Sequence, residues 1–473
     1  MKRILRHPFF YILLLSPVIL WGLTLLLPTF DDWTYVTAPY FDDVFNPKRM
    51  LPFYNKWRPF DALFGSLVGL NTRLFPTLNH ICVYAGHLAC TYLVYRFSRK
   101  FQFNDFSTNI ATLFFFISPA VLGTVLGIDS MNQVYSQLWG LMGLWSYLFY
   151  QKRRRIIFWL LCVTIATFTK ENGLMWAIIP PVIHHAFIHS DRKELKRGLI
   201  AGFCLIFCYL IIRLSLPTDM VDTHSDYFRS GMLKRLQFVA TFISYTWLPA
   251  DYVSIIYPPK RNILIAAVTI ILSLPFIYSL FIARFHLIRH KKYITLVICA
   301  VIAALPHLLT SYTCMHPYAS LSIAAWLVAY ILNTCQHKKY VAVAFILYAC
   351  AACFTDLHHG ISAYHSGLNG KHLALQAVEK TGKPVQSAYI ININNGETKY
   401  SSFCTIPYEA FGWGIAAKYE TGYTWPEEME DTTVTSKKPE LIQATVHGKL
   451  KAGYDCVWLI DGTNLTVIKS STH

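Results

Sequence analysis

Carboxylate and cationic side chains stand at the ends of several apolar runs in this sequence. Asp31 and Asp32 directly follow the first run, Asp129 follows the third, and Glu171 stands beside Lys170 in a short polar interruption. A carboxylate can act as a general base towards a hydroxyl group, and adjacent carboxylates can raise each other's pKa. Nearby cations can hold a phosphate leaving group, and the candidates are Arg58, Arg73, Lys170, Arg213, Arg229 and Arg261.

Each of these features also has a simpler structural interpretation. An Asp-Asp pair after an apolar helix is typical of an interfacial stop or a helix cap, and Lys-Glu-Asn-Gly is typical of a turn. His80 and His87 stand about two helical turns apart, and packing within a bundle explains them better than ligation does. The chemical interpretation therefore depends on the conjunction of these residues at one place.

The composition indicates a membrane protein. The chain has 473 residues, of which 54% are hydrophobic and 14% charged, whereas a soluble domain carries about 25% charged residues. These values exclude disorder, collagen and small disulfide scaffolds. The 12 cysteines lie mostly within apolar runs, so we expect no metal site. Cys404 and Cys456 are compatible with a disulfide and equally with two free thiols.

Apolar stretches long enough to cross a bilayer recur along the first 356 residues. The first runs from Phe9 to about Pro28, and we interpret it as a retained helix because no cleavage site follows it. Further candidates lie near 77–96, 107–127, 132–150, 198–216, 262–283, 293–310, 317–333 and 340–356. The stretch 155–187 is too long for one helix, and Lys170-Glu171-Asn172-Gly173 interrupts it.

The positions of the cations decide the topology. If the N-terminus lies inside and 155–187 is a hairpin that turns at Lys170-Glu171, 20 Lys and Arg residues lie on inside segments. The short outside turns near 129 and 314 then carry none. The stretch 236–250 must in that case be re-entrant or interfacial. The result is about eleven spans with the C-terminus outside, and the net charge of +16 then gives no support to a nucleic-acid partner.

The acids follow the opposite distribution. Residues 1–355 contain 14 acidic residues, and 11 of them fall on the outer side: Asp31, Asp32, Asp42, Asp43, Asp61, Asp129, Glu171, Asp219, Asp222, Asp226 and Asp251. Ionisable groups at the ends of membrane spans mark candidate functional sites. We therefore expect the site on the outer rim.

The chain divides into two predicted domains. Residues 1–356 form the transmembrane domain, with long outer loops at 30–76 and 217–261, and residues 357–473 form a polar tail. The tail contains helical stretches at 358–380 and 439–453, a strand-like run from Ser387 to Asn392, and a hairpin-like Asp455–Ile468 with Asp461-Gly462 at its turn. We expect a small α/β domain outside the membrane.

Several short motifs resemble a known family. These are Asp31-Asp32 after the first span, Lys56-Trp57-Arg58-Pro59, Asn79-His80, Ser118-Pro119 through Asp129, Thr169-Lys170-Glu171-Asn172-Gly173 and Trp247-Leu248-Pro249-Ala250-Asp251-Tyr252. Together they resemble the integral-membrane glycosyltransferases of the GT-C fold, nearest to the branch with the protein O-mannosyltransferases. The resemblance covers roughly residues 1–335. Where that branch often has an Arg before its tenth span, this chain has His316 as a substitute.

The resemblance implies a polyprenyl-phosphate sugar donor and an inverting transfer to an acceptor hydroxyl on the outer face. Asp31 or Asp32 would be the general base, with Asp31 preferred. Lys170 and Arg58 would neutralise the lipid phosphate, while Glu171 would orient Lys170 or the acceptor. The further site residues would be Asp129, Asp251 and His316. The resemblance implies no metal and no cofactor.

The expected partners are the donor, membrane lipids and an acceptor lipid, glycan or protein, in a bacterial inner (plasma) membrane with the site and C-terminus extracytoplasmic. Two other functions remain open. A flippase or transporter of lipid-linked glycans predicts polar residues deep within the spans, and there are few. A polymerase or ligase of glycans predicts a large outer loop late in the bundle, and none is evident.

Overall fold

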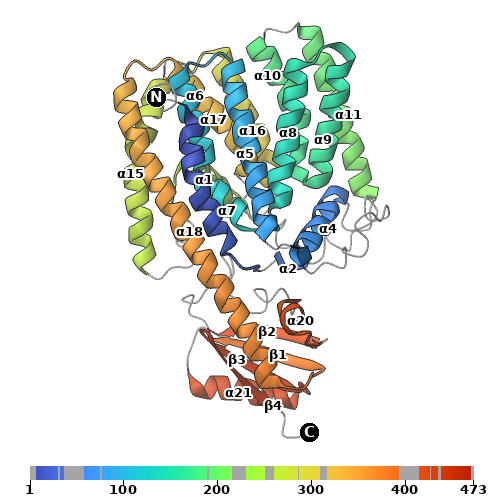
Figure 1. Ribbon diagram of the computed structural model, residues 1–473. Helices are drawn as coiled ribbons and strands as arrows, with labels where there is room; N and C mark the ends of the chain where they lie inside the picture. Colours follow the sequence, from blue (N-terminus) through green and yellow to red (C-terminus); the bar gives the residue numbers. More distant parts are fainter. Residues whose placement is uncertain are drawn as a thin grey trace.

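One long helix connects the two parts of the molecule, a bundle of helices and a small sheet domain (Figure 1). The structure is a computed structural model. It describes residues 7–29, 32–36, 58–74, 77–188, 191–215, 231–250, 260–285, 287–308, 317–393, 415–424, 426, 428–434 and 438–469.

The bundle is built from helices that run lengthwise and side by side (Figure 1). Its first half contains α1 (Pro8–Thr24), α5 (Thr77–Lys100), α6 (Asp105–Phe116), α7 (Pro119–Leu126), α8 (Met131–Phe149), α9 (Lys152–Thr169), η3 (Glu171–Ala177), α10 (Ile179–Ile188) and α11 (Arg192–Ser215). Its second half contains α13 (Met232–Trp247), α15 (Lys260–Arg284), α16 (Lys291–Leu308), α17 (Tyr318–Asn333) and the first part of α18 (Lys338–Thr381). The short α2 (Asp32–Val36) and the oblique α4 (Pro59–Leu74) lie across one end of the bundle (Figure 1).

Three helices within the described residues are long and apolar enough to cross a membrane. They are Arg192–Ser215, Ile263–Arg284 and Lys338–Thr381, and the shorter Pro8–Thr24 and Ser320–Asn333 are also apolar. These helices agree with an integral membrane protein. The expected total of about eleven spans stays a prediction.

The third predicted span differs from expectation. We expected one helix over 107–127, but α6 ends at Phe116 and α7 begins at Pro119. Proline has no backbone N–H and clashes with the preceding turn of a helix, whereas it is well suited to the first position of a new one. The break lets α7 change direction before the turn that carries Asp129.

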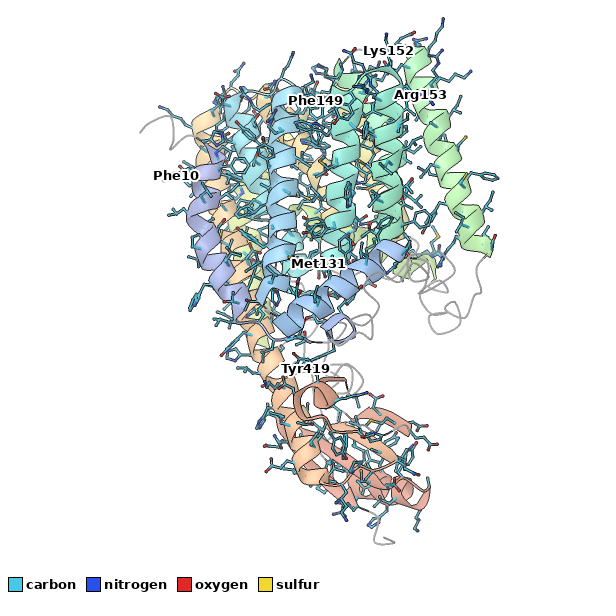
Figure 2. All side chains as sticks on the ribbon, turned by 45° about the vertical axis from the view of Figure 1, so that its right-hand side comes forward. Phe10, Met131, Phe149, Lys152, Arg153 and Tyr419 are labelled. Atoms are coloured by element: carbon cyan, nitrogen blue, oxygen red, sulfur yellow. The ribbon has the colours of Figure 1, made fainter. Side chains whose placement is uncertain are left out.

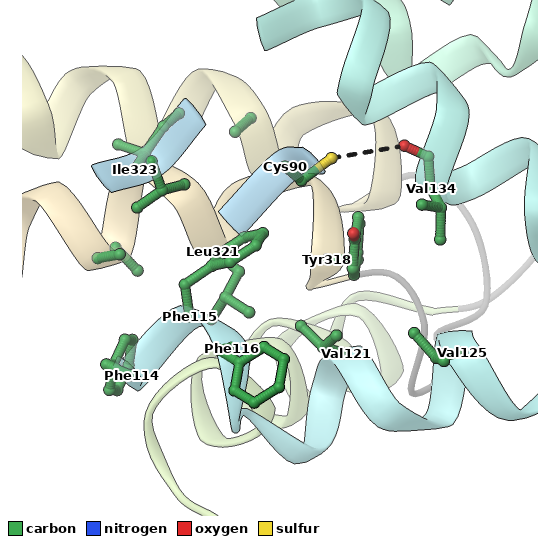
Figure 3. Close-up of a cluster of buried hydrophobic side chains, with 14 of the residues drawn as sticks. Cys90, Phe114, Phe115, Phe116, Val121, Val125, Val134, Tyr318, Leu321 and Ile323 are labelled. Carbon is green, nitrogen blue, oxygen red and sulfur yellow. Dashed lines mark hydrogen bonds between the residues drawn. The ribbon is translucent and has the colours of Figure 1, made fainter. Parts of the chain in front are cut away.

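The core of the bundle contains aromatic and aliphatic side chains from several helices (Figure 3). Phe115 and Phe116 are buried, and both rings stack on the buried imidazole of His87, with centroid distances of 5.4 and 5.5 Å. The two imidazole nitrogens of His87 lie 3.2 Å from the Tyr318 hydroxyl and from the Phe116 carbonyl. The contacts of His87 are therefore those of a packed histidine with hydrogen-bond partners.

The segment 155–187 is a hairpin in the structure. α9 ends at Thr169, the chain reverses at Lys170, and η3 packs back against α9. Gly173 makes this return possible, because a Cβ at that position would lie 2.4 Å from the backbone carbon of Ala166. Lys170 and Glu171 are consequently held at the tip of the hairpin.

The cationic helix ends meet at one end of the bundle, where Figure 2 shows Lys152, Arg153 and Phe149. Contacts between described residues join these segments: Lys100 to Phe149, Arg155 to Glu194, Lys291 to His185, and Lys292 to Phe187. The helices α2 and α4 lie at the other end (Figure 2).

α18 extends for 44 residues, from the bundle into the sheet domain (Figure 1). The boundary predicted at 356/357 falls inside this helix, since the predicted span 340–356 and the predicted helix 358–380 form one continuous element. Asp356 and His359 end the apolar run without interrupting the backbone pattern of the helix.

The sheet domain contains four strands in the order β2-β1-β3-β4. β1 (Ser387–Ile393) pairs in parallel with β2 (Glu428–Val434) and β3 (Cys456–Asp461), and β3 pairs antiparallel with β4 (Asn464–Lys469) through the predicted turn at Asp461-Gly462. The helices α20 (Ile415–Thr421) and α21 (Pro439–Lys451) complete it. The predicted small α/β domain is present, although β2 was not expected. Cys456 is buried, and Cys404 lies outside the described residues.

Candidate active site

Asp32, the first residue of α2, connects this helix to the turn between α7 and α8. Its side chain is only 4% exposed, and its carboxylate accepts three backbone hydrogen bonds. The Thr29 N–H donates to Oδ2 at 3.2 Å, and the Ile128 and Asp129 N–H groups donate to Oδ1 at 2.7 and 2.9 Å. The bonds from Ile128 and Asp129 hold α2 against the 127–130 turn.

Asp129 lies beside Asp32 as a result. The Ser130 hydroxyl donates to Asp129 Oδ1 at 3.2 Å, and Gly127 leaves room for the carboxylate, because a Cβ there would lie 2.5 Å from Oδ1. Burial raises the pKa of Asp32, and the charge of Asp129 raises it further. Burial also raises the pKa of Asp129, against the opposing effect of Lys170. Two close carboxyl groups with raised pKa values can share and exchange a proton.

A polar network extends from α2 to the tip of the α9–η3 hairpin. The Tyr35 hydroxyl donates to Asp61 Oδ1 at 2.8 Å, and Asn132 Nδ2 donates to the same oxygen at 3.1 Å. Lys170 Nζ in turn donates to Asn132 Oδ1 at 3.1 Å. Burial lowers the pKa of Lys170, and the nearby Arg58 lowers it further, while the surrounding carboxylates oppose this effect. Asn132 therefore bridges an anionic and a cationic group.

Arg58 forms a two-point ion pair with Glu171. Arg58 Nε donates to Oε1 at 2.8 Å and Nη2 donates to Oε2 at 2.7 Å, while Asp61 lies 3.8 Å from Nη1. Burial acts to lower the pKa of Arg58, but the Glu171 and Asp61 carboxylates outweigh it and raise this pKa. Burial acts to raise the pKa of Glu171, but the Arg58 guanidinium outweighs it and keeps this pKa low. The pair is ionised and fixed in orientation.

Nearly the whole chain is similar in structure to a solved protein, ArnT. The crystal structure of ArnT from Cupriavidus metallidurans in the apo state aligns with a TM-score of 0.50 and 11% sequence identity, covering 97% of this chain and 98% of that one. The chain has the GT-C glycosyltransferase fold. The structure of the same ArnT bound to undecaprenyl phosphate aligns with a TM-score of 0.49 and 10% identity, over 98% of each chain. No protein-family model matches the sequence, and no curated protein matches it.

Five residues predicted for the site lie in this one region of the GT-C fold: Asp32, Arg58, Asp129, Lys170 and Glu171. Three others lie outside the described residues, namely Asp31, Asp251 and His316. Glu171 was expected to orient Lys170 or the acceptor, but its hydrogen bonds go to Arg58.

Sequence reasoning gave no role to Tyr35, Asp61 or Asn132, which complete the network. Tyr35 stands three residues after Asp32, and Asn132 stands three residues after Asp129. Asp32 and Tyr35 both lie in α2, and residues three apart share a face of a helix, so a search of that face would have found Tyr35. Among the described residues, no group of three or more His, Cys, Asp or Glu side chains has an arrangement that could hold a metal ion.

The region combines carboxyl groups and cationic groups. The carboxyl groups of Asp32 and Asp129 can accept or exchange a proton, while Lys170 and Arg58 supply positive charge a short distance away. All of these side chains lie at loops and helix ends, and a rigid bundle positions them.

Proposed function

We propose that this chain is a membrane glycosyltransferase that transfers a sugar from a polyprenyl-phosphate donor to an acceptor hydroxyl, with inversion at the anomeric carbon. The observation that carries the proposal is the proximity of the Asp32–Asp129 carboxyl pair to Lys170 and Arg58. The GT-C fold of the chain supports it. The sugar is a hexose or a pentose, and the acceptor is a lipid, a glycan or a protein.

In this mechanism the carboxylate of Asp31 or Asp32 removes the proton of the acceptor hydroxyl. The hydroxyl oxygen then forms the new bond to the anomeric carbon. The bond between that carbon and the phosphate oxygen breaks, and its electron pair leaves with the lipid phosphate. Lys170 and Arg58 stabilise the negative charge that develops on the leaving group. No step requires a metal or a cofactor.

We assign the base to Asp31 and a positioning role to Asp32. The Asp32 carboxylate already accepts three backbone hydrogen bonds, which supports its role in holding the 127–130 turn. Glu171 fixes the orientation of Arg58. Asp129 is a secondary site residue, as are Asp251 and His316, with His316 as a phosphate contact.

The cationic helix ends lie together at one end of the bundle, and this supports one orientation of the bundle in the membrane. Cytoplasmic segments carry an excess of Lys and Arg, so the end with Lys152 and Arg153 faces the cytoplasm and the site faces outward (Figure 2). In this orientation residues 1–356 carry the reaction, and 357–473 form an extracytoplasmic domain. The membrane is the inner, or plasma, membrane of a bacterium.

Single Asp-to-Asn variants test the mechanism in membranes supplied with a labelled polyprenyl-phosphate sugar. General-base catalysis contributes about 10²- to 10⁴-fold, so Asp31→Asn should lower the transfer rate by about that factor. Asp32→Asn should lower it less. Asp105→Asn is the matched control, because Asp105 pairs with Arg99 at the cationic end and is highly exposed. If both Asp31→Asn and Asp32→Asn transferred sugar at the parental rate, the assignment of the base would be wrong.

A further inference from the structure

The short helix α2 makes contacts on several sides. Asp32 faces the 127–130 turn, and Tyr35 faces Asp61. Between them in sequence, Trp33 packs against Tyr419 of α20, with ring centroids 5.8 Å apart and planes inclined by 56°. The Trp33 side chain is only 4% exposed. Figure 2 places Tyr419 at the junction between the bundle and the sheet domain.

A second contact holds the segment that leads into α2. Gly367 of α18 lies against Leu27, because a Cβ at Gly367 would be 3.0 Å from the Leu27 Cβ and 3.4 Å from its carbonyl oxygen. α18 also anchors α20 through the ion pair of Lys371 with Glu420, at 3.0 Å. Two separate contacts therefore reach residues 27–33 from the C-terminal part of the chain.

Helix α2 depends on such contacts. It has five residues, and a helix of this length is not stable by itself in water. Its position relative to the 127–130 turn is therefore set by what packs on it. The backbone bonds from Ile128 and Asp129 to Asp32 act on one side, and the contact of Trp33 with Tyr419 acts on another.

We propose that the C-terminal domain positions the candidate active site through the Trp33–Tyr419 and Leu27–Gly367 contacts. Trp33, Tyr419 and Gly367 are positioning residues, and they act through the placement of Asp32. This inference rests on the proposed glycosyltransferase function. In this proposal the C-terminal domain aligns the carboxylates. The phosphate contacts of Lys170 and Arg58 depend instead on the α9–η3 hairpin and α4.

The aromatic contact is tested by a double-mutant cycle on the full chain in membranes. Tyr419→Ala and Trp33→Ala should each lower kcat by roughly ten- to a hundredfold, because a misplacement of about 1 Å can cost that much. The donor KM should change by less than about threefold. The double variant should be no slower than the slower single variant, since both changes remove one shared contact. Tyr419→Phe should keep the parental kcat, because the ring makes the contact.

Two matched variants serve as controls. Tyr454→Ala removes a tyrosine from the other side of the sheet domain, where its ring contacts Tyr389, and it should leave kcat unchanged. Gly367→Ala should lower kcat, whereas Gly360→Ala should not, because no atom lies within 4 Å of a Cβ at Gly360.

The possible failures can be told apart. If Tyr419→Ala and Gly367→Ala kept the parental kcat while Asp31→Asn was inactive, the positioning inference would be wrong and the proposed function would stand. The positioning inference would also be wrong if the losses of Tyr419→Ala and Trp33→Ala multiplied in the double variant. If membranes containing the parent chain transferred no sugar from the labelled polyprenyl-phosphate donor, the proposed function would fail instead.

Discussion

Arg58 and Glu171 stand 113 positions apart in the sequence, yet their side chains form a two-point ion pair at 2.7 and 2.8 Å. This pair joins the start of α4 to the tip of the α9–η3 hairpin. Because Glu171 occupies the guanidinium, a donor phosphate must share or displace this carboxylate to contact Arg58. Lys170, which donates to Asn132 Oδ1 at 3.1 Å, is the second cationic group of the proposed site.

The ion pair predicts a loss in the variant Arg58→Lys. Lysine is a point charge and cannot form both hydrogen bonds. The Arg58 and Glu171 side chains are 35% and 36% exposed, so we expect a loss of about 1–2 kcal/mol in the free energy of unfolding, at the low end for charged hydrogen bonds. Transfer activity should fall about tenfold or more.

Thermal unfolding in detergent micelles and the labelled-donor assay measure these two effects. Arg99→Lys is the control, because Arg99 pairs with Asp105 at an exposed position and should change neither quantity. A melting temperature for Arg58→Lys equal to that of the parent would contradict a structural role for the pair.

The buried carboxyl pair predicts an unusual dependence of stability on pH. Burial raises the pKa of Asp32 and of Asp129 in the folded chain. Between the ordinary carboxyl pKa of about 4 and the raised value, the folded chain binds more protons than the unfolded chain. Stability therefore falls as the pH rises through this window.

Asp32→Asn tests this sign. The variant lacks one titrating group, and its amide oxygen can still accept the Ile128 and Asp129 N–H bonds. Its melting temperature should vary less with pH above about 4 than that of the parent. Melting curves over a pH series measure this, and an equal or steeper slope in the variant would refute the explanation.

Gly173→Ala should destabilise the chain strongly. A Cβ there would lie 2.4–2.6 Å from backbone atoms of Ala166 and Thr167, and backbone atoms cannot rotate away as a side chain can. We expect a loss of about 1–3 kcal/mol or more, seen as a lower melting temperature and yield. Gly22→Ala is the matched control, since no atom lies within 4 Å of a Cβ at Gly22, and it should be at least as stable as the parent.

The orientation can be tested with reporters of the cytoplasmic and extracytoplasmic compartments. A reporter fused after His473 should report the extracytoplasmic side, and one inserted at Tyr150-Gln151, between α8 and α9, should report the cytoplasm. The two fusions control for each other's expression and insertion. A cytoplasmic signal from the C-terminal fusion would overturn the proposed orientation.

The positions of charges made part of this arrangement predictable from sequence. The cations near both ends of 155–187 required a hairpin, and the structure has its turn at Lys170. The same rule predicted that Asp32, Asp129 and Glu171 lie on the outer side of the membrane, because each of them stands at the outer end of a predicted span. The charge pattern could not supply the pairing of Glu171 with Arg58, which depends on how α4 packs.

Other features were missed because the length of an apolar stretch indicates a segment buried in the membrane but does not indicate where a helix ends. Pro119 breaks a stretch that is continuously apolar, so one expected span became two helices. Conversely, Asp356 and His359 end an apolar stretch inside one helix. Asn132 gave no signal, because a single amide in a helix has no charge and no characteristic spacing.

The continuity of α18 makes it a ruler between the membrane and the sheet domain. With a rise of about 1.5 Å per residue, its 44 residues extend over roughly 66 Å. Each added residue would lift the domain by about 1.5 Å and rotate it by about 100°. Insertions between Phe354 and Gly367 should therefore change the direction of Tyr419 relative to Trp33, with the period of the helix. A two-residue insertion would turn Tyr419 about 200° away, whereas a seven-residue insertion would restore its direction about 10 Å further out.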